Sequence, residues 1–263
     1  MNSNRKHLKS VEDFGVVFKE AHLNGIDLVL VGGQACSFFA LRYRSRSKGL
    51  EKLYPYTSKD IDFFGGEYEA DALARVLQRK LKRSPRKGGM LGLSVGKIEV
   101  NPETLIEIVG SICGLSDREV KKLVLLEEFK GSKIQILHPV LLYVSKAACL
   151  LTLDQKGRQD RRHLQLLEYI LPEYLKDLLQ DEKREKEFLQ SCERLCDFLI
   201  SRHGLELVNQ GHRSSCEFFP VIPKIPSVKI RRFYEKRLPQ IKAELEKRLN
   251  SLRLLRMEKG IKS

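Results

Sequence analysis

The stretch DLVLVGGQA constrains the fold most, because two glycines join a buried strand to a helix. Residues 27–31 are an apolar run of strand length, and a helical pattern follows over residues 34–43. Glycine allows a phosphate group to approach the backbone closely, and the N-terminus of the following helix offers free N–H groups. The pattern predicts that Gly32 and Gly33 bind phosphate, although a Gly-Gly turn after a strand is more often only a turn.

Two aspartates stand two residues apart in a second predicted strand, residues 59–64 (KDIDFF). Side chains two apart in a strand point to the same face, so Asp60 and Asp62 project together while Ile61 and Phe63 enter the core. Two such carboxylates repel each other unless a cation lies between them, and Mg²⁺ or Mn²⁺ prefers oxygen ligands. The spacing favours a metal site, and a solvated strand edge is the alternative.

A third acid stands in the apolar segment LIEIV, where Glu107 is expected to be buried. A buried carboxylate needs a partner or a metal ion. Three carboxylates would complete a two-metal site, in which one ion activates an attacking hydroxyl and the other stabilises the leaving group. Glu99, in the segment KIEV, competes for this third position, and Glu107 is preferred.

The periodicity of the chain changes at His138-Pro139. Before this point the pattern alternates between helices and short strands; after it, long helical stretches follow one another. The order predicts an α+β fold, with a mixed sheet and flanking helices over residues 1–138 and an all-α region over residues 139–263. The expected helices are 10–23, 34–43, 68–83, 139–153, 158–179, 182–201 and 227–256, the last divided near Pro239; the expected strands are 27–31, 59–64, 90–95, 104–109, 122–129 and 133–137.

The formal net charge of +14 favours polyanionic partners such as RNA, DNA or nucleotides. Two segments concentrate this charge. Residues 75–87 hold seven Lys and Arg and no acid, and residues 224–263 hold thirteen Lys and Arg against four Glu. A solvated helix face is the alternative for either segment alone.

Several classes of protein are disfavoured. No apolar run approaches the roughly 18 residues needed to span a membrane, and the polar N-terminus is not followed by the apolar region of a secretory signal. The six cysteines lack metal-ligand spacing and suit a reduced, cytoplasmic protein. No Walker A motif is present.

The ordered combination of VLVGGQA, a basic loop and SKDIDFF resembles the DNA polymerase β-like nucleotidyltransferase superfamily. The later segments LIEIVGSICGL, LHPVLLYVSKAACLLTL and QDRRHLQLL resemble a minimal bacterial and phage branch of that superfamily, close to the toxins of abortive-infection toxin–antitoxin pairs. The resemblance covers roughly residues 25–170. It implies a nucleotidyltransferase fold, an NTP substrate, an RNA acceptor, a toxin role and an antitoxin protein as partner.

The resemblance also implies roles for particular residues. Gly32, Gly33 and Lys59 would hold the triphosphate, and Asp60 and Asp62 would bind the metal ions. Glu107 would be the third acid, a position at which Asp is more usual. Lys146 would meet phosphate charge, or it is a surface lysine on an amphipathic helix. Arg158 and Asp160 would line the same cleft or lock the helices together.

Three functions stay open at this point. The first is a metal-dependent enzyme that transfers a nucleoside monophosphate to RNA, with tRNA as one such acceptor. The second is transfer to a small molecule, which a strongly basic protein suits less well when the acceptor is a polycation. The third is a non-catalytic module that binds nucleotide or RNA and retains the fold.

Overall fold

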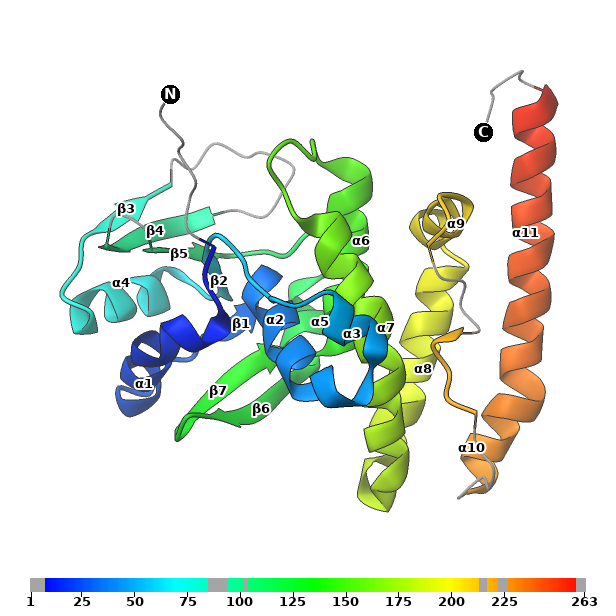
Figure 1. Ribbon diagram of the computed structural model, residues 1–263, viewed down its shortest axis with the longest axis horizontal. Coiled ribbons are helices and arrows are strands. Elements are labelled where there is room, and N and C mark those ends of the chain that lie inside the picture. Colours follow the sequence, from blue (N-terminus) through cyan, green and yellow to red (C-terminus); the bar gives the residue numbers. More distant parts are fainter. Residues whose placement is uncertain (1–7, 85–93, 102–103, 213–216, 222–226, 259–263) are drawn as a thin grey trace. The chain divides into compact units, whose positions relative to one another are not determined.

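The computed structural model describes residues 8–84, 94–101, 104–212, 217–221 and 227–258, and Figure 1 shows their arrangement. The chain divides into two compact units, residues 1–170 and 171–263. The expected α+β class with a helical C-terminal region is confirmed.

The described residues of the first unit form a seven-stranded mixed sheet in the order β3-β4-β5-β2-β1-β7-β6. The central pairs β2–β5 and β1–β7 are parallel, whereas β1–β2, β3–β4, β4–β5 and β6–β7 are antiparallel. The strands are β1 (Val29–Val31), β2 (Ile61–Phe64), β3 (Leu81–Arg83), β4 (Ser94–Asn101), β5 (Thr104–Val109), β6 (Val124–Phe129) and β7 (Ser132–Leu137).

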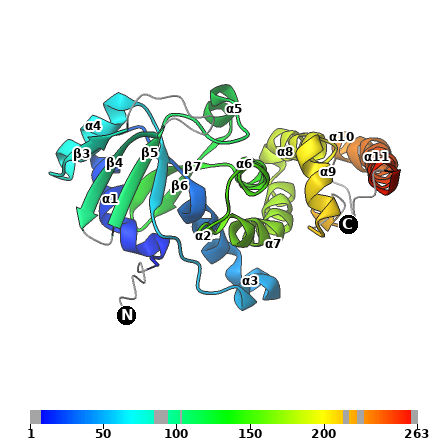
Figure 2. The same ribbon diagram turned by 90° about the horizontal axis from the view of Figure 1, so that it is seen from above.

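Helices cover this sheet and bury its apolar residues. Helices α1 (Gly15–Leu23) and α4 (Glu67–Val76) lie side by side and contact β7 and β4 respectively. Helix α2 (Gly32–Tyr43) contacts β1 and β2 as well as α6 (Pro139–Thr152), as Figure 2 shows. The alternation in β2 places Ile61 and Phe63 in the core, as the sequence predicts, because successive side chains leave a strand on opposite faces.

The remaining helical elements of the first unit are short, apart from α7. They are η1 (Val11–Phe14), η2 (Arg44–Arg46), α3 (Lys48–Lys52) and α5 (Asp117–Lys122); α7 (Asp160–Gln180) begins in the first unit and ends in the second.

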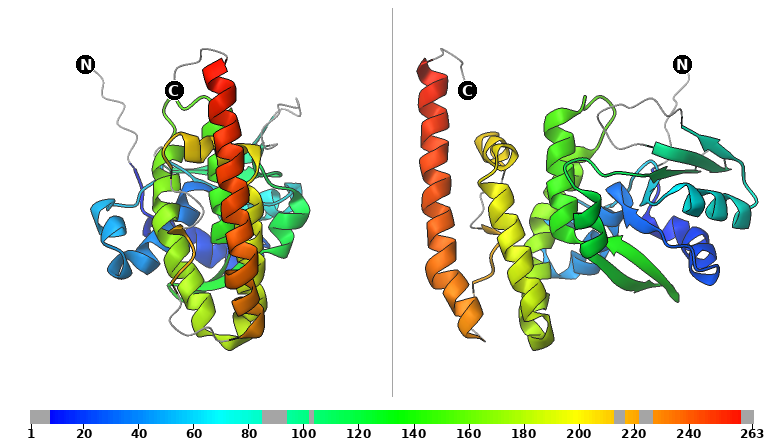
Figure 3. Two further views of the ribbon diagram at one scale, coloured as in Figure 1. Left: turned by 90° about the vertical axis from the view of Figure 1, so that its right-hand side faces the viewer. Right: turned by 180° about the vertical axis from the view of Figure 1, so that it is seen from behind.

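The described part of the second unit is helical. Helix α11 (Leu238–Glu258) contacts both α8 (Glu185–Leu199) and α9 (Arg202–Asn209), and Figure 3 shows these helices. The other elements are η3 (Glu182–Arg184), α10 (Val228–Arg232) and the π-helical turn η5 (Phe233–Arg237). The regular helix α11 begins beside Pro239, where the sequence predicts a division, because proline at the start of a helix loses no intrahelical hydrogen bond.

Some expected elements are wrong in part. The helix expected over residues 68–83 ends at Val76, because Gln78 adopts a positive φ of 53° and Leu81–Arg83 then pairs with β4. The strand expected over residues 59–64 begins only at Ile61, so Asp60 directly precedes β2. The strand expected over residues 90–95 lies mostly outside the described residues; β4 starts at Ser94 and continues to Asn101.

The change from sheet to helix falls at His138, which caps α6 by accepting a hydrogen bond at Nδ1 from the Val140 amide. The first compact unit nevertheless continues to Ile170. It does so because α6 packs against α2, and the beginning of α7 is tied to α6 by an ion pair between Lys146 and Asp160. In the part of the chain that the structure describes, no helix has the length and apolarity needed to cross a membrane.

Candidate active site

A cleft of about 480 Å³ in the first unit collects the residues that the sequence singles out. It lies where β1 ends and α2 begins, and it is also lined by β2, β5, α6 and the start of α7. All eight predicted site residues line it: Gly32, Gly33, Lys59, Asp60, Asp62, Glu107, Lys146 and Arg158.

The N-terminus of α2 forms one wall of the cleft. The helix begins at Gly32, and no side chain caps it at Val31. Gly32 adopts a positive φ of 67°, and a Cβ atom there would overlap the carboxylate of Asp62, whose Cγ would be only 2.9 Å away. Glycine is therefore required both by the backbone conformation and by the close approach of Asp62.

The register of the sheet brings Asp62 and Glu107 together. Asp62 pairs with Val31 on the antiparallel side of β2 and with Glu107 on its parallel side. Laterally paired residues project to the same face of a sheet, so the two carboxylates share one face. Asp60, directly before β2, is close enough to Asp62 to influence its ionisation.

Glu107 is not the buried lone carboxylate that the apolar segment suggests. Its side chain is 23% exposed, and it lies 3.4 Å from the Nζ atom of Lys97, its cross-strand neighbour on β4. The expectation of burial is wrong because β5 alternates, with Ile106 and Ile108 facing the core and Glu107 facing the cleft. The rival acid Glu99 does not line the cleft and instead pairs with Lys82 at 2.8 Å.

The environment of Asp62 disfavours its charge. Burial raises the pKa of this carboxyl to about 6; Lys146 acts in the opposite direction, and the negative charges of Glu107 and Asp60 raise it further. The repulsion that the sequence predicts between Asp60 and Asp62 is thus present, with Glu107 adding to it.

Lys146 is buried and paired, so it is not the surface lysine of the alternative reading. Its Nζ atom donates to Asp160 Oδ1 at 3.0 Å, and Arg158 Nε donates to the other oxygen of the same carboxylate. Burial acts to lower the pKa of Lys146, but Asp160 together with Cys36, Cys149 and Asp62 more than offsets this, so the pKa lies above the ordinary value. Asp160 therefore locks α6 to α7, and it keeps a positive charge on the wall of the cleft.

Lys59 closes another side of the cleft. Its ammonium group donates to the carbonyl oxygen of Gly157 at 2.6 Å, which ties the loop before β2 to the loop before α7. An ammonium group has three donors, so this hydrogen bond leaves it able to contact an anion as well.

His163 and Ser58 also line the cleft and were not singled out from the sequence. A Cβ atom at Gly33 would collide with the Ser58 hydroxyl and lie 2.6 Å from Cε1 of His163. The available signal was the spacing of Asp160 and His163 in QDRRHL, because residues three apart on a helix share a face.

The carboxylates suit a hard divalent cation only in part. Asp60 and Asp62 offer oxygen donors at one side of the cleft, but Glu107 is engaged by Lys97. Among the described residues, no group of three or more His, Cys, Asp or Glu side chains is arranged to hold a metal ion. Asp60 and Asp62 would therefore be the primary ligands, and Glu107 would join them only by leaving Lys97.

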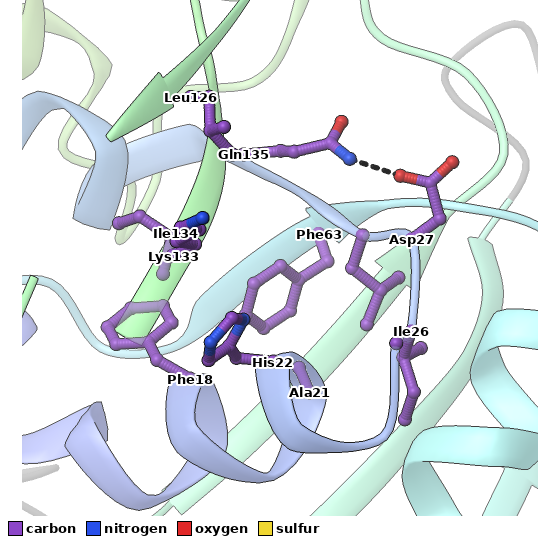
Figure 4. A pocket seen from close by; sticks show the side chains of 12 residues that line it. Phe18, Ala21, His22, Ile26, Asp27, Phe63, Leu126, Lys133, Ile134 and Gln135 are labelled. Carbon is purple, nitrogen blue, oxygen red and sulfur yellow. Dashed lines mark hydrogen bonds between the residues drawn. The ribbon is translucent and has the colours of Figure 1, made fainter. Parts of the chain in front are cut away.

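A second cavity, of about 320 Å³, lies between α1 and β7 and has a different character. Figure 4 shows Phe18, Phe63 and Ile134 around it, with Asp27 and Gln135 hydrogen-bonded to each other at its rim. None of the eight predicted site residues lines this cavity, and it offers no pair of carboxylates facing one another.

No protein-family model matches the chain, and no curated protein matches it. Solved structures similar to it include an antigenic nucleotidyltransferase-like protein from Paracoccidioides brasiliensis, at 12% identity over 70% of this chain and 95% of that one, with a TM-score of 0.38. They also include JHP933 from Helicobacter pylori, at 16% identity over 94% of this chain and 97% of that one, with a TM-score of 0.34. Similarities at this level carry no argument about function, which therefore rests on the residues of the cleft.

Proposed function

We propose that the protein is a metal-dependent nucleotidyltransferase that moves a nucleoside monophosphate from an NTP to an acceptor hydroxyl. The observation that carries the proposal is the convergence in one cleft of an uncapped helix N-terminus, three carboxylates and a buried, paired lysine. In the reaction, the acceptor hydroxyl releases its proton to solvent and its oxygen bonds to the α-phosphorus; the bond from this phosphorus to the oxygen that bridges to the β-phosphorus breaks, and pyrophosphate leaves.

The basic groups and the carboxylates of the cleft would have different roles. The N–H groups at the start of α2, together with Lys146 and Lys59, would bind the negative charge of the triphosphate. Asp60 and Asp62 would hold Mg²⁺ or Mn²⁺, which supplies activation of the hydroxyl and neutralisation of the leaving group. Asp160 is a positioning residue, because it fixes Lys146 and Arg158 without needing to touch the substrate.

RNA is the acceptor we favour. The net charge of +14 would attract a polyanion, and Arg75, Arg79 and Lys80 are exposed in the first unit. Arg83 and Lys82 contribute less, because they pair with Asp71 and Glu99. Arg86 and Lys87, the rest of this basic segment, lie outside the described residues.

The test incubates the protein with Mg²⁺ or Mn²⁺, total RNA and each of four NTPs labelled at the α-phosphate. We expect one NTP to label RNA, and we expect no label with Asp60→Ala. Label on small molecules but not on RNA would move the acceptor to the small-molecule class. Absence of label on any acceptor would contradict the proposal.

One observation favours a second candidate, a nucleotide- or RNA-binding module without catalysis. The ion pair between Lys97 and Glu107 removes the third acid from a metal site. If this pair persists, Lys97→Gln should increase the affinity for Mn²⁺ and the rate of any transfer. A binding module would bind NTP in both forms and transfer nothing in either.

A toxin role and an antitoxin protein remain part of the proposal through the sequence resemblance. Modification of an RNA that blocks its use would stop growth. Induced expression of the chain in bacteria should then arrest growth, whereas the Asp60→Ala variant at equal abundance should not. Equal growth with both forms would remove the toxin role and leave the enzymatic proposal standing.

A further inference from the structure

We propose that His163 is a nucleotide-binding residue whose imidazole N–H donates a hydrogen bond to the triphosphate of the NTP. The inference deepens the function proposed above and rests on it. No role for this residue follows from the carboxylates or from the Lys146–Asp160–Arg158 cluster, so it extends the site to a new side chain.

The first observation is that the imidazole of His163 is buried and its nitrogens lack hydrogen-bond partners. The residue is only 4% exposed, and neither Nδ1 nor Nε2 has a hydrogen-bond partner within the described part of the chain. A buried polar group without a partner is costly, and such groups are rare outside functional sites. The cost is understandable if a ligand supplies the missing partner.

The second observation is where the ring lies. His163 packs against Gly33, in the first turn of α2, beside the Ser58 hydroxyl. The N-terminus of α2 has no side-chain cap, so its N–H groups and the positive end of its dipole face the same cleft. A phosphate bound there would lie next to the imidazole.

The imidazole is uncharged, so it would orient a bound phosphate through a hydrogen bond and would add no positive charge to the site. Burial lowers the pKa of His163 to about 3, the positive charge of Lys146 acts in the same direction, and Asp160 opposes it. The imidazole is therefore neutral at pH 7, with one N–H donor and one acceptor nitrogen. Lys146 supplies the positive charge, and His163 would orient the phosphate relative to Gly33.

Both nitrogens are buried, so binding requires the ring or the groups that cover it to move. An apolar replacement of His163 distinguishes a ligand-binding role from a purely structural one. If His163 only packs against its neighbours, the replacement should leave ligand binding unchanged. If His163 binds the ligand, the replacement should weaken binding while the protein becomes more stable.

The test measures binding of inorganic tripolyphosphate and of each NTP, with and without Mg²⁺, by calorimetry, together with chemical unfolding of the ligand-free protein. We expect His163→Leu to weaken tripolyphosphate and NTP binding about tenfold while the ligand-free protein is as stable as the unchanged protein or more so. His163→Gln, which keeps a donor, should restore binding to within about threefold. The matched control is His22→Leu, a change of the same chemistry at an exposed position of the other cavity, and it should leave binding unchanged.

Equal affinity in His163→Leu and the unchanged protein would overturn the inference, and so would a failure of His163→Gln to restore binding. If His163→Leu does not fold, His163→Met takes its place with the same expectations. Failure of the proposed function gives a different result, because the unchanged protein would then bind none of the four NTPs. Binding and transfer by the unchanged protein, with no effect of His163→Leu, would overturn the role of His163 alone.

Discussion

At the scale of single residues, Asp62 combines a functional position with an unfavourable environment. Its pKa of about 6 means that the folded protein holds the proton more tightly than the unfolded chain. Stability therefore falls as the pH rises from about 4 to 6, and the loss is complete above pH 6. A neutral side chain of the same shape avoids this loss.

We expect Asp62→Asn to stabilise the ligand-free protein by about 1–2 kcal/mol at pH 8, an amount below the full linkage value because the buried amide is imperfectly satisfied. Near pH 4, where the Asp62 carboxyl is protonated in the folded protein, only the cost of the amide remains, so the variant should be slightly less stable than the parent; nucleotide transfer should be lost at every pH. Chemical unfolding of both proteins across this pH range checks the prediction. A variant less stable than the parent at pH 8 would show that the carboxylate is satisfied by groups other than a metal ion.

His163 has the opposite pH dependence. Its folded-state pKa of about 3 lies below the ordinary value of 6.5, so the unfolded chain takes up a proton first as the pH falls. The stability that depends on neutral His163 is present above pH 6.5 and is lost progressively toward pH 3. The His163→Leu variant should lose less stability than the parent between pH 7 and pH 4, as measured by chemical unfolding. If the stability of both proteins falls equally with decreasing pH, the lowered pKa of His163 would be refuted.

The sequence predicts the position of the site residues better than their surroundings. Asp60, Asp62, Gly32 and Gly33 stand out because strand spacing and glycine carry direct geometric meaning. The pairing of Glu107 with Lys97 was not predictable, because it depends on the register between β4 and β5. Burial of His163 was equally hidden, since it depends on how α7 meets Gly33.

At the scale of elements, the junction of β1 and α2 depends on Gly32. We expect Gly32→Ala to cost about 3 kcal/mol, because the methyl group must adopt a positive φ and also displace Asp62. Gly25→Ala is the matched control: its φ of 61° is similar, but no atom lies within 4 Å of the added group, so a cost of about 1 kcal/mol is expected. Equal costs at the two positions would show that Asp62 does not press on the start of α2.

The contact between α6 and α7 depends on one buried carboxylate. Asp160→Ala should destabilise the protein by about 3 kcal/mol, because it leaves Lys146 charged and without its buried partner. The double variant Lys146→Met with Asp160→Leu replaces both partners by apolar side chains, so it should be nearly as stable as the unchanged protein. It should have no activity, because Lys146 is absent. On α11, Glu244→Ala breaks an exposed ion pair with Arg248 and should leave the stability almost unchanged. Activity in the double variant would contradict the role of Lys146.

The sequence predicts well those elements in which apolar residues recur at a regular spacing and a turn residue marks the end. The hairpin of β6 and β7 follows from alternation on both sides of Gly131, which adopts a φ of 75°. The segment after Val76 was misread because its Lys and Arg residues have good helix propensity, whereas pairing with β4 makes it a strand. Local propensity cannot indicate that an edge strand is needed at this place.

At the scale of the whole molecule, the sequence predicts the α+β class and the helical C-terminal region. Long periodic helices after His138 differ plainly from the short alternating strands before it. The extent of the first compact unit, to Ile170, was not predictable, because it depends on the buried ion pair between α6 and α7. The same ion pair completes the wall of the cleft, so the site needs helices from beyond the sheet region.

The most direct test of the central claim measures pyrophosphate released together with α-phosphate label transferred, for the unchanged protein and for Asp62→Asn. Asp62→Asn is the sharpest comparison because it is expected to be folded and at least as stable as the parent at pH 8. We predict equal amounts of pyrophosphate and transferred label from the unchanged protein with Mg²⁺ or Mn²⁺, and neither product from Asp62→Asn. Transfer at the parent rate by a folded Asp62→Asn variant would contradict the assignment of this cleft as the active site.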